Sequence, residues 1–86
     1  MKNRGRTEML ATMLEVAKGK VTKTKIMYSA FLSYNQLKDY LDVLIENNLL
    51  EYLNGTKTFK TTEKGLNYLK MYSEIGELLK TTIKIN

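Results

Sequence analysis

The chain has 86 residues, enough for one domain, with 43% hydrophobic and 27% charged residues, as in ordinary globular proteins. Fourteen Lys and Arg against nine Asp and Glu give a net charge of +5, which favours polyanionic partners. Cysteine and histidine are absent, which excludes disulfides and the commonest general base and metal ligand, and no apolar run approaches the ~20 residues of a membrane span.

The first element expected is a helix from about Thr7 to Lys18. Its apolar residues recur at steps of three and four, which indicates one buried face. Thr7 suits the N-cap and Gly19 suits the residue after the helix. The basic residues before it, Arg4 and Arg6, have two interpretations: a solvated tail, or an arm that contacts phosphates or a minor groove.

Two more helices are expected in close succession. The first covers roughly 23–30, with Thr22 as its cap. Residues 31–32 form a turn, and Ser33 caps a longer helix over 34–47 with a leucine-rich stripe. Asn47-Asn48 ends that helix, because Asn tolerates the left-handed conformation.

A β-hairpin is expected next. Leu49–Leu53 and Lys57–Thr61 have the residue pattern of strands, and Phe59 is the apolar anchor of the second. Asn54-Gly55 between them predicts a tight primed turn, which requires positive φ at both central residues. Val21, far earlier in the chain, sits in a short extended link that is a candidate single rung of strand.

The last helix is expected over about 63–82, capped by Thr61 or Thr62. Leu66 and Leu69 are expected to close the core, while the later apolar residues extend beyond what so small a domain can cover. Such stranded apolar surface usually meets a partner, so this helix is predicted to form a homodimer. The expected interface residues are Tyr68, Tyr72, Ile75, Leu78, Leu79 and Ile83.

These elements predict an α+β fold: a winged helix-turn-helix, with a three-helix core, a β-hairpin wing and a long C-terminal dimerisation helix. Residues 1–62 form the core with its basic arm. Residues 63–86 close that core and form the dimer contact, within a single domain overall.

The helix-turn-helix favours double-stranded DNA as the partner. In this motif the second helix enters the major groove with its N-terminal end first. Asn and Gln pair with adenine, and Lys reaches guanine or phosphate. The alternative is a polar surface helix whose Tyr34 packs on the core. The candidate DNA-contacting residues are Arg4, Arg6, Lys20, Lys23, Lys25, Ser33, Tyr34, Asn35, Gln36, Lys38, Asn54, Thr56 and Lys57.

Chemistry is not indicated. The serines have no histidine to activate them, the carboxylate pairs have the spacing of solvated helix faces, and there is no phosphate-binding glycine loop or metal-ligand cluster. We therefore predict no enzyme activity, cofactor or metal. The tyrosines are expected in the core and at interfaces, and not as base-stacking platforms: Tyr28, Tyr40, Tyr52, Tyr68 and Tyr72.

Several motifs resemble the archaeal winged-helix predicted transcriptional regulators. They are KTKIMY at 23–28, LSY at 32–34, QL at 36–37, YL at 40–41 and TEKG at 62–65. The resemblance covers roughly residues 4–80 and extends to small archaeal chromatin proteins of the same fold that dimerise through a C-terminal helix. It implies a DNA-binding dimer, although the last helix is shorter than in the chromatin proteins with long coiled coils.

Three functions follow as hypotheses. The first is a homodimeric transcriptional regulator that binds double-stranded DNA, is cytoplasmic and associates with the nucleoid. The second is an architectural nucleoid protein with little sequence preference. The third is a protein–protein adaptor, which the net charge of −3 over residues 26–55 supports.

Overall fold

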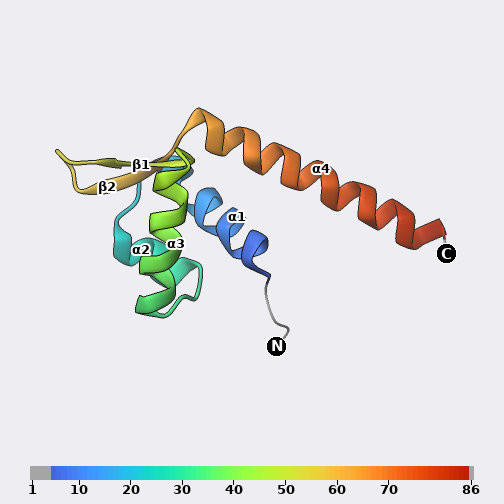
Figure 1. Cartoon of the computed structure of the whole chain (residues 1–86), viewed down its shortest axis with the longest axis horizontal. Helices are drawn as coiled ribbons and strands as arrows, with labels where there is room; N and C mark the ends of the chain where they lie inside the picture. The colour runs from blue at the N-terminus through green and yellow to red at the C-terminus, as the bar shows by residue number, and fades with distance from the viewer. Residues whose placement is uncertain (1–4, 86) are drawn as a thin grey trace.

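The structure, a computed structural model, describes residues 5–85 and the side chains of residues 5–79. Within these residues, three helices are followed by a single hairpin and then by a long last helix (Figure 1). The elements are α1 (Arg6–Val16), a 3₁₀ turn η1 (Ala17–Gly19), α2 (Lys23–Ser29), α3 (Tyr34–Glu46), β1 (Leu50–Leu53), β2 (Thr58–Thr61) and α4 (Glu63–Ile85).

One apolar core joins α1, α2, α3 and the base of the hairpin. Each helix contributes most of its apolar stripe, although Ile45 of α3, expected in that stripe, is 38% exposed, and the hairpin adds Leu50 and Phe59. The core is closed, because its largest side chains have less than 2% of their surface exposed: Met13, Leu14, Ile26, Leu37 and Leu44. The predicted three-helix core with a hairpin wing is confirmed.

Both predicted caps of the helix-turn-helix are formed. The Thr22 hydroxyl accepts a hydrogen bond from the backbone N–H of Lys25 at 3.2 Å. At α3, the Ser33 hydroxyl accepts from the N–H of Gln36 at 3.2 Å, and the Gln36 side-chain oxygen accepts from the N–H of Ser33 at 3.0 Å. This reciprocal capping box satisfies two N–H groups that the helix itself cannot.

The ends of the first helix differ from the prediction. Gly5 precedes the helix, and its carbonyl accepts from the N–H of Met9 at 3.0 Å, while Thr7 lies inside the first turn. The chain leaves η1 through Lys20, at φ 62°, and not through a left-handed Gly19. The 3₁₀ turn adds three residues after α1, which moves the reversal one position along the chain.

The predicted primed turn at Asn54-Gly55 is wrong. Leu53 pairs with Thr58, so four residues form the loop, and the positive φ of 57° falls on Lys57. Core contacts set this register: Phe59 exchanges two backbone hydrogen bonds with Val21, at 2.7 and 2.9 Å. A two-residue turn would shift the pairing by two and turn Lys57 toward the core face.

The start of α4 is packed tightly against the end of α3. The Thr62 hydroxyl accepts from the N–H of Gly65 at 3.0 Å and donates to the carbonyl of Asn48 at 2.6 Å. A Cβ at Gly65 would collide with the carbonyl oxygen of Leu49 and with Cγ2 of Thr61. Gly65 is therefore required by close approach, and not merely tolerated near a helix end.

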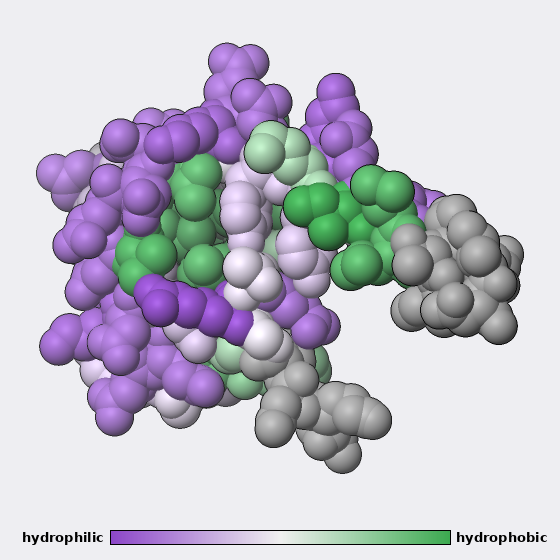
Figure 2. All heavy atoms as spheres, turned by 45° about the vertical axis from the view of Figure 1, so that its right-hand side comes forward, coloured by the Kyte–Doolittle hydropathy of each residue, from purple (hydrophilic) through white to green (hydrophobic). Residues whose placement is uncertain are grey.

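The C-terminal part of α4 leaves the core and projects from the molecule, at the opposite end from the wing (Figure 1). Leu69 is half-buried, but Leu66 is 44% exposed, so the prediction that Leu66 closes the core is wrong. Leu66 lies about 100° around the helix from Gly65, the residue that faces the core. Figure 2 shows hydrophobic residues gathered on the projecting part of the helix.

Candidate nucleic-acid interface

The N-terminal end of α3, residues 33–38, is called the α3 tip. All its residues except Leu37 are exposed. The capping box holds Ser33 and Gln36 in place, so the Gln36 oxygen is already engaged while its amide nitrogen is a remaining donor. Asn35 and Lys38 point their side chains into solvent from a rigid helical turn. The α3 tip is thus a fixed polar surface of the kind that base recognition requires.

Three of the predicted contact residues meet around one shallow pocket. Lys23 at the start of α2 and Tyr34 and Lys38 on α3 line it, above a floor that includes Phe59. Tyr34 is 61% exposed, which argues against the alternative that it packs on the core. Two amines and a phenol at the rim can receive a phosphate, and the apolar floor can receive a sugar or base edge, but the carboxylate of Asp42 also lines the pocket and repels phosphate on its side.

The wing carries a second group of candidates. Asn54, Thr56 and Lys57 form its exposed tip, where the hydroxyls of Thr56 and Thr58 are 2.6 Å apart. The pairing of Val21 with Phe59 also aligns the backbone of Lys20 with that of Lys60, a residue outside the predicted set. Only the non-local pairing shows that these two lysines are neighbours.

The remaining cations are more scattered. Arg4 lies outside the described residues. Arg6 begins α1 and Lys25 lies on the exposed side of α2. Neither Arg6 nor Lys25 lines the pocket at the α3 tip, so any contact that these two residues make is with more distant phosphates.

The negative charge expected from the sequence of residues 26–55 forms an acidic stripe along α3. Asp39, Asp42 and Glu46 are all exposed, share a helix face with Asn35 and lie opposite the buried leucines of the helix. Carboxylates repel phosphates, so α3 cannot lie in a groove along its full length.

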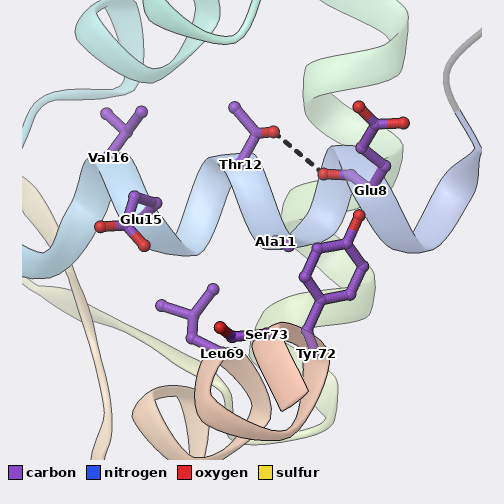
Figure 3. Close-up of a pocket in the computed structure, with 8 residues that line it drawn as sticks. All are labelled: Glu8, Ala11, Thr12, Glu15, Val16, Leu69, Tyr72 and Ser73. Carbon is purple, nitrogen blue, oxygen red and sulfur yellow. Dashed lines mark hydrogen bonds between the residues drawn. The ribbon is translucent and has the colours of Figure 1, made fainter. Parts of the chain in front are cut away.

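A second shallow groove lies between α1 and α4 (Figure 3). Leu69 and Tyr72 from α4 face Ala11, with Glu8 and Glu15 on the α1 wall. Burial, together with the neighbouring Tyr72, raises the pKa of the Tyr68 phenol. Over the described residues there is no group of three His, Cys, Asp or Glu placed to hold a metal.

The predicted interface residues on α4 divide into two sets. Tyr68 packs within its own protomer, since its hydroxyl donates to the carbonyl of Thr7 at 3.2 Å and its ring stacks on Tyr72. Further along, an apolar surface is 57–66% exposed, and it consists of Ile75, Leu78 and Leu79, with Met71 at 58% beside it. The side chain of Ile83 lies outside the described residues.

The tyrosines also differ from expectation. Tyr28 is 69% exposed on α2, so it is neither a core residue nor part of the α4 surface. Tyr52 is 45% exposed but packs on Phe59, with ring centroids 5.0 Å apart. At seven residues, α2 is too short for the spacing of its apolar residues to show whether a tyrosine is buried or exposed.

A helix-turn-helix followed by a hairpin wing, with an exposed second-helix tip, defines the winged helix-turn-helix class. The chain belongs to this family, whose sequence model, described as winged helix-turn-helix, matches residues 3–80. It is 34% identical over 76 residues to an uncharacterized protein of Methanocaldococcus jannaschii, covering 87% of this chain and 73% of that one.

Solved structures share the fold. Sso10a-2, a DNA-binding protein from Sulfolobus solfataricus, superposes with a TM-score of 0.80 at 23% identity, covering 95% of this chain and 88% of that one. ZitR of Lactococcus lactis, in complex with DNA, gives a TM-score of 0.66 at 18% identity, covering 98% of this chain and 61% of that one. No helix in the described part of the chain combines the length and apolarity that spanning a bilayer requires.

Proposed function

We propose that the protein is a transcriptional regulator that binds double-stranded DNA as a homodimer, without catalysis, at the nucleoid. The observation that carries this is the α3 tip: a rigid, capped turn with Asn35 and Lys38 exposed and Lys23 beside them. The tip enters the major groove, where Asn pairs with adenine and Lys with guanine or phosphate. DNA binding by Sso10a-2 and ZitR supports this use of the fold.

The wing and the lysines before α2 supply phosphate contacts. Lys57 lies at the exposed wing tip, and Lys20 and Lys60 lie where the wing joins the core. Such contacts fix the position of the protein on the duplex without reading its sequence. Base selection is therefore assigned to the α3 tip, with the amide nitrogen of Gln36 as an additional donor.

The dimer is proposed to form through the projecting part of α4. Ile75, Leu78 and Leu79 are more than half exposed there, and exposed apolar patches of this kind mark protein contacts. A second copy of the same helix is a matched partner, because it presents the same apolar face. Two α3 tips would then read two half-sites on one duplex.

The acidic stripe bears on the two rival functions. An architectural protein gains affinity only from phosphates, and Asp39 and Asp42 weaken that attraction on every sequence. A regulator can use Asp39 to accept from the amino group of cytosine. The stripe also suits a protein–protein adaptor with a basic partner, and this remains the second candidate function.

A gel-shift comparison of matched variants tests the proposal. Asn35→Ala and Lys38→Ala are expected to weaken duplex binding, while Lys70→Ala, which removes one charge on α4 far from the α3 tip, is not. Gln36→Ala is unsuitable because it also opens the capping box. Unchanged binding by both α3 variants would favour the adaptor.

The ratio of specific to non-specific affinity distinguishes a transcriptional regulator from an architectural nucleoid protein. The affinity for a selected site is compared with that for random duplex at one salt concentration. A regulator gives a ratio of about a thousand or more. Near-equal affinities would identify an architectural protein instead.

A further inference from the structure

The turn between α2 and α3 holds a phenylalanine where a glycine is usual. Phe31 has φ 57°. Its N–H donates to the carbonyl of Tyr28 at 3.3 Å, and the N–H of Leu32 donates to the carbonyl of Met27 at 3.0 Å. This pair of bonds is a Schellman motif, whose left-handed position is normally Gly or Asn. A bulky residue there is strained.

The end of α3 provides an internal comparison. The N–H of Asn48 donates to the carbonyl of Ile45 at 3.0 Å, and that of Leu49 to the carbonyl of Leu44 at 2.9 Å. Asn48 has φ 61°, so the same motif recurs with nearly the same backbone conformation. At α3 the left-handed residue is one that tolerates it, whereas at α2 it is not. The Schellman motif itself therefore does not require Phe at position 31.

Phe31, whose backbone is strained, also has the most exposed side chain of the large apolar residues described. Phe31 is 83% exposed, with Tyr28 at 69% and Tyr34 at 61% on either side of it in sequence. We call these three residues the turn aromatics. The motif could avoid this strain with Asn or Gly, and strain of that kind points to function. The turn aromatics include one residue of the α3 tip, Tyr34, and Phe31 comes two residues before the tip in sequence.

Charge identifies the class of partner. Between Glu15 and Asp39 the chain has no acidic residue and five lysines: Lys18, Lys20, Lys23, Lys25 and Lys38. The turn aromatics lie within this segment. An apolar protein surface has no need of such charge, whereas duplex DNA offers phosphates for the lysines and apolar sugars and thymine methyl groups for rings.

We propose that Phe31, flanked by Tyr28 and Tyr34, contacts the apolar parts of duplex DNA at the edge of the major groove. The proposal rests on the DNA-binding function above and adds to it an anchor that is not electrostatic. Phe31 comes two residues before Ser33, the N-cap of α3, and its side chain is exposed, so we place its ring at the groove wall when the α3 tip is inserted. The contact compensates in the complex for strain in the free protein.

The test is a variant that gains stability and loses binding. Phe31→Asn places at the turn the residue that α3 already uses in its matching motif. Its thermal midpoint is expected to rise by a few degrees, because the left-handed strain is relieved. Its affinity for duplex is expected to fall about tenfold to a hundredfold, since burial of one phenylalanine side chain is lost. Phe31→Tyr keeps the ring and is expected to retain affinity.

Salt dependence and a control distinguish this contact from a phosphate contact. The loss in Phe31→Asn is expected to be the same factor at every salt concentration, with the slope of log affinity against log salt unchanged. Asn48→Gly, at the matching position of α3, is expected to leave affinity unchanged. If Phe31→Asn binds as well as the unaltered chain, the proposal is overturned while the DNA-binding function stands.

Failure of the proposed function has a different signature, because the unaltered chain would not bind duplex at all. Where the loss is observed, duplex containing uracil in place of thymine identifies its source. An equal loss for the unaltered chain on uracil duplex assigns the contact to thymine methyl groups. Retained affinity there assigns it to deoxyribose.

Discussion

Two glycines in α4 have opposite roles. Gly65 sits against the carbonyl of Leu49 and the side chain of Thr61, where a Cβ has no room. Gly76 lies in the projecting part of the helix, with open space around its Cβ position. Their neighbours in the fold, and not the residue type, determine what a substitution does.

Substituting each glycine with alanine is expected to change stability in opposite directions. Gly65→Ala lowers the free energy of unfolding by about 1–3 kcal/mol through overpacking. Gly76→Ala raises it by about 1 kcal/mol through helix propensity. Urea unfolding at one fixed protein concentration measures both. Equal effects of the two substitutions would contradict the close approach at Gly65.

The capping residues were predictable from sequence because a cap acts over three residues. Thr22 and Ser33 were identified by residue type and position, and both form their bonds. Phe31 was expected only to form a turn. Its left-handed conformation follows from how α2 must end for α3 to pack, and no local pattern reports that requirement.

At the scale of elements, α3 depends on its capping box. Ser33→Ala removes the acceptor for the Gln36 N–H and is expected to cost about 1 kcal/mol of stability. Thr24→Ala, at an exposed position on α2, is the matched control and is expected to change stability by less than about 0.5 kcal/mol. Thermal unfolding compares them, and equal midpoints for both variants would show that the box contributes nothing.

The wing is expected to contact phosphates and not bases. Lys57→Ala should weaken binding by a similar factor on every duplex and make the salt slope shallower by about one. Lys57 has positive φ, so Lys57→Asn is a second variant that suits the backbone. A loss confined to one DNA sequence would contradict this role and place the wing in base readout.

The hairpin also shows where prediction from sequence ends. Its strands follow from residue type, and Phe59 was correctly identified as the anchor. The loop length did not follow, because pairing with Val21 across about forty residues of sequence sets the register. The lysines that this pairing aligns were likewise not predictable as neighbours.

The core and the projecting helix are proposed to have separate tasks, DNA binding and dimerisation. Ile75→Asp is expected to convert the dimer to a monomer, because it puts a charge in the middle of the apolar surface of α4. Glu74→Ala, on the neighbouring exposed position, should leave the dimer intact. Sedimentation over a range of concentrations measures both. A monomeric unaltered chain would contradict the dimer.

Duplex affinity, measured by fluorescence anisotropy from low to moderate salt, tests the proposed DNA binding at its base. If the α3 tip enters the groove with the wing and neighbouring lysines on phosphates, the unaltered chain binds, and its affinity falls steeply. For ~6 phosphate contacts, log affinity against log salt has a slope of about −5. No binding at low salt, or an affinity that salt does not change, would contradict it.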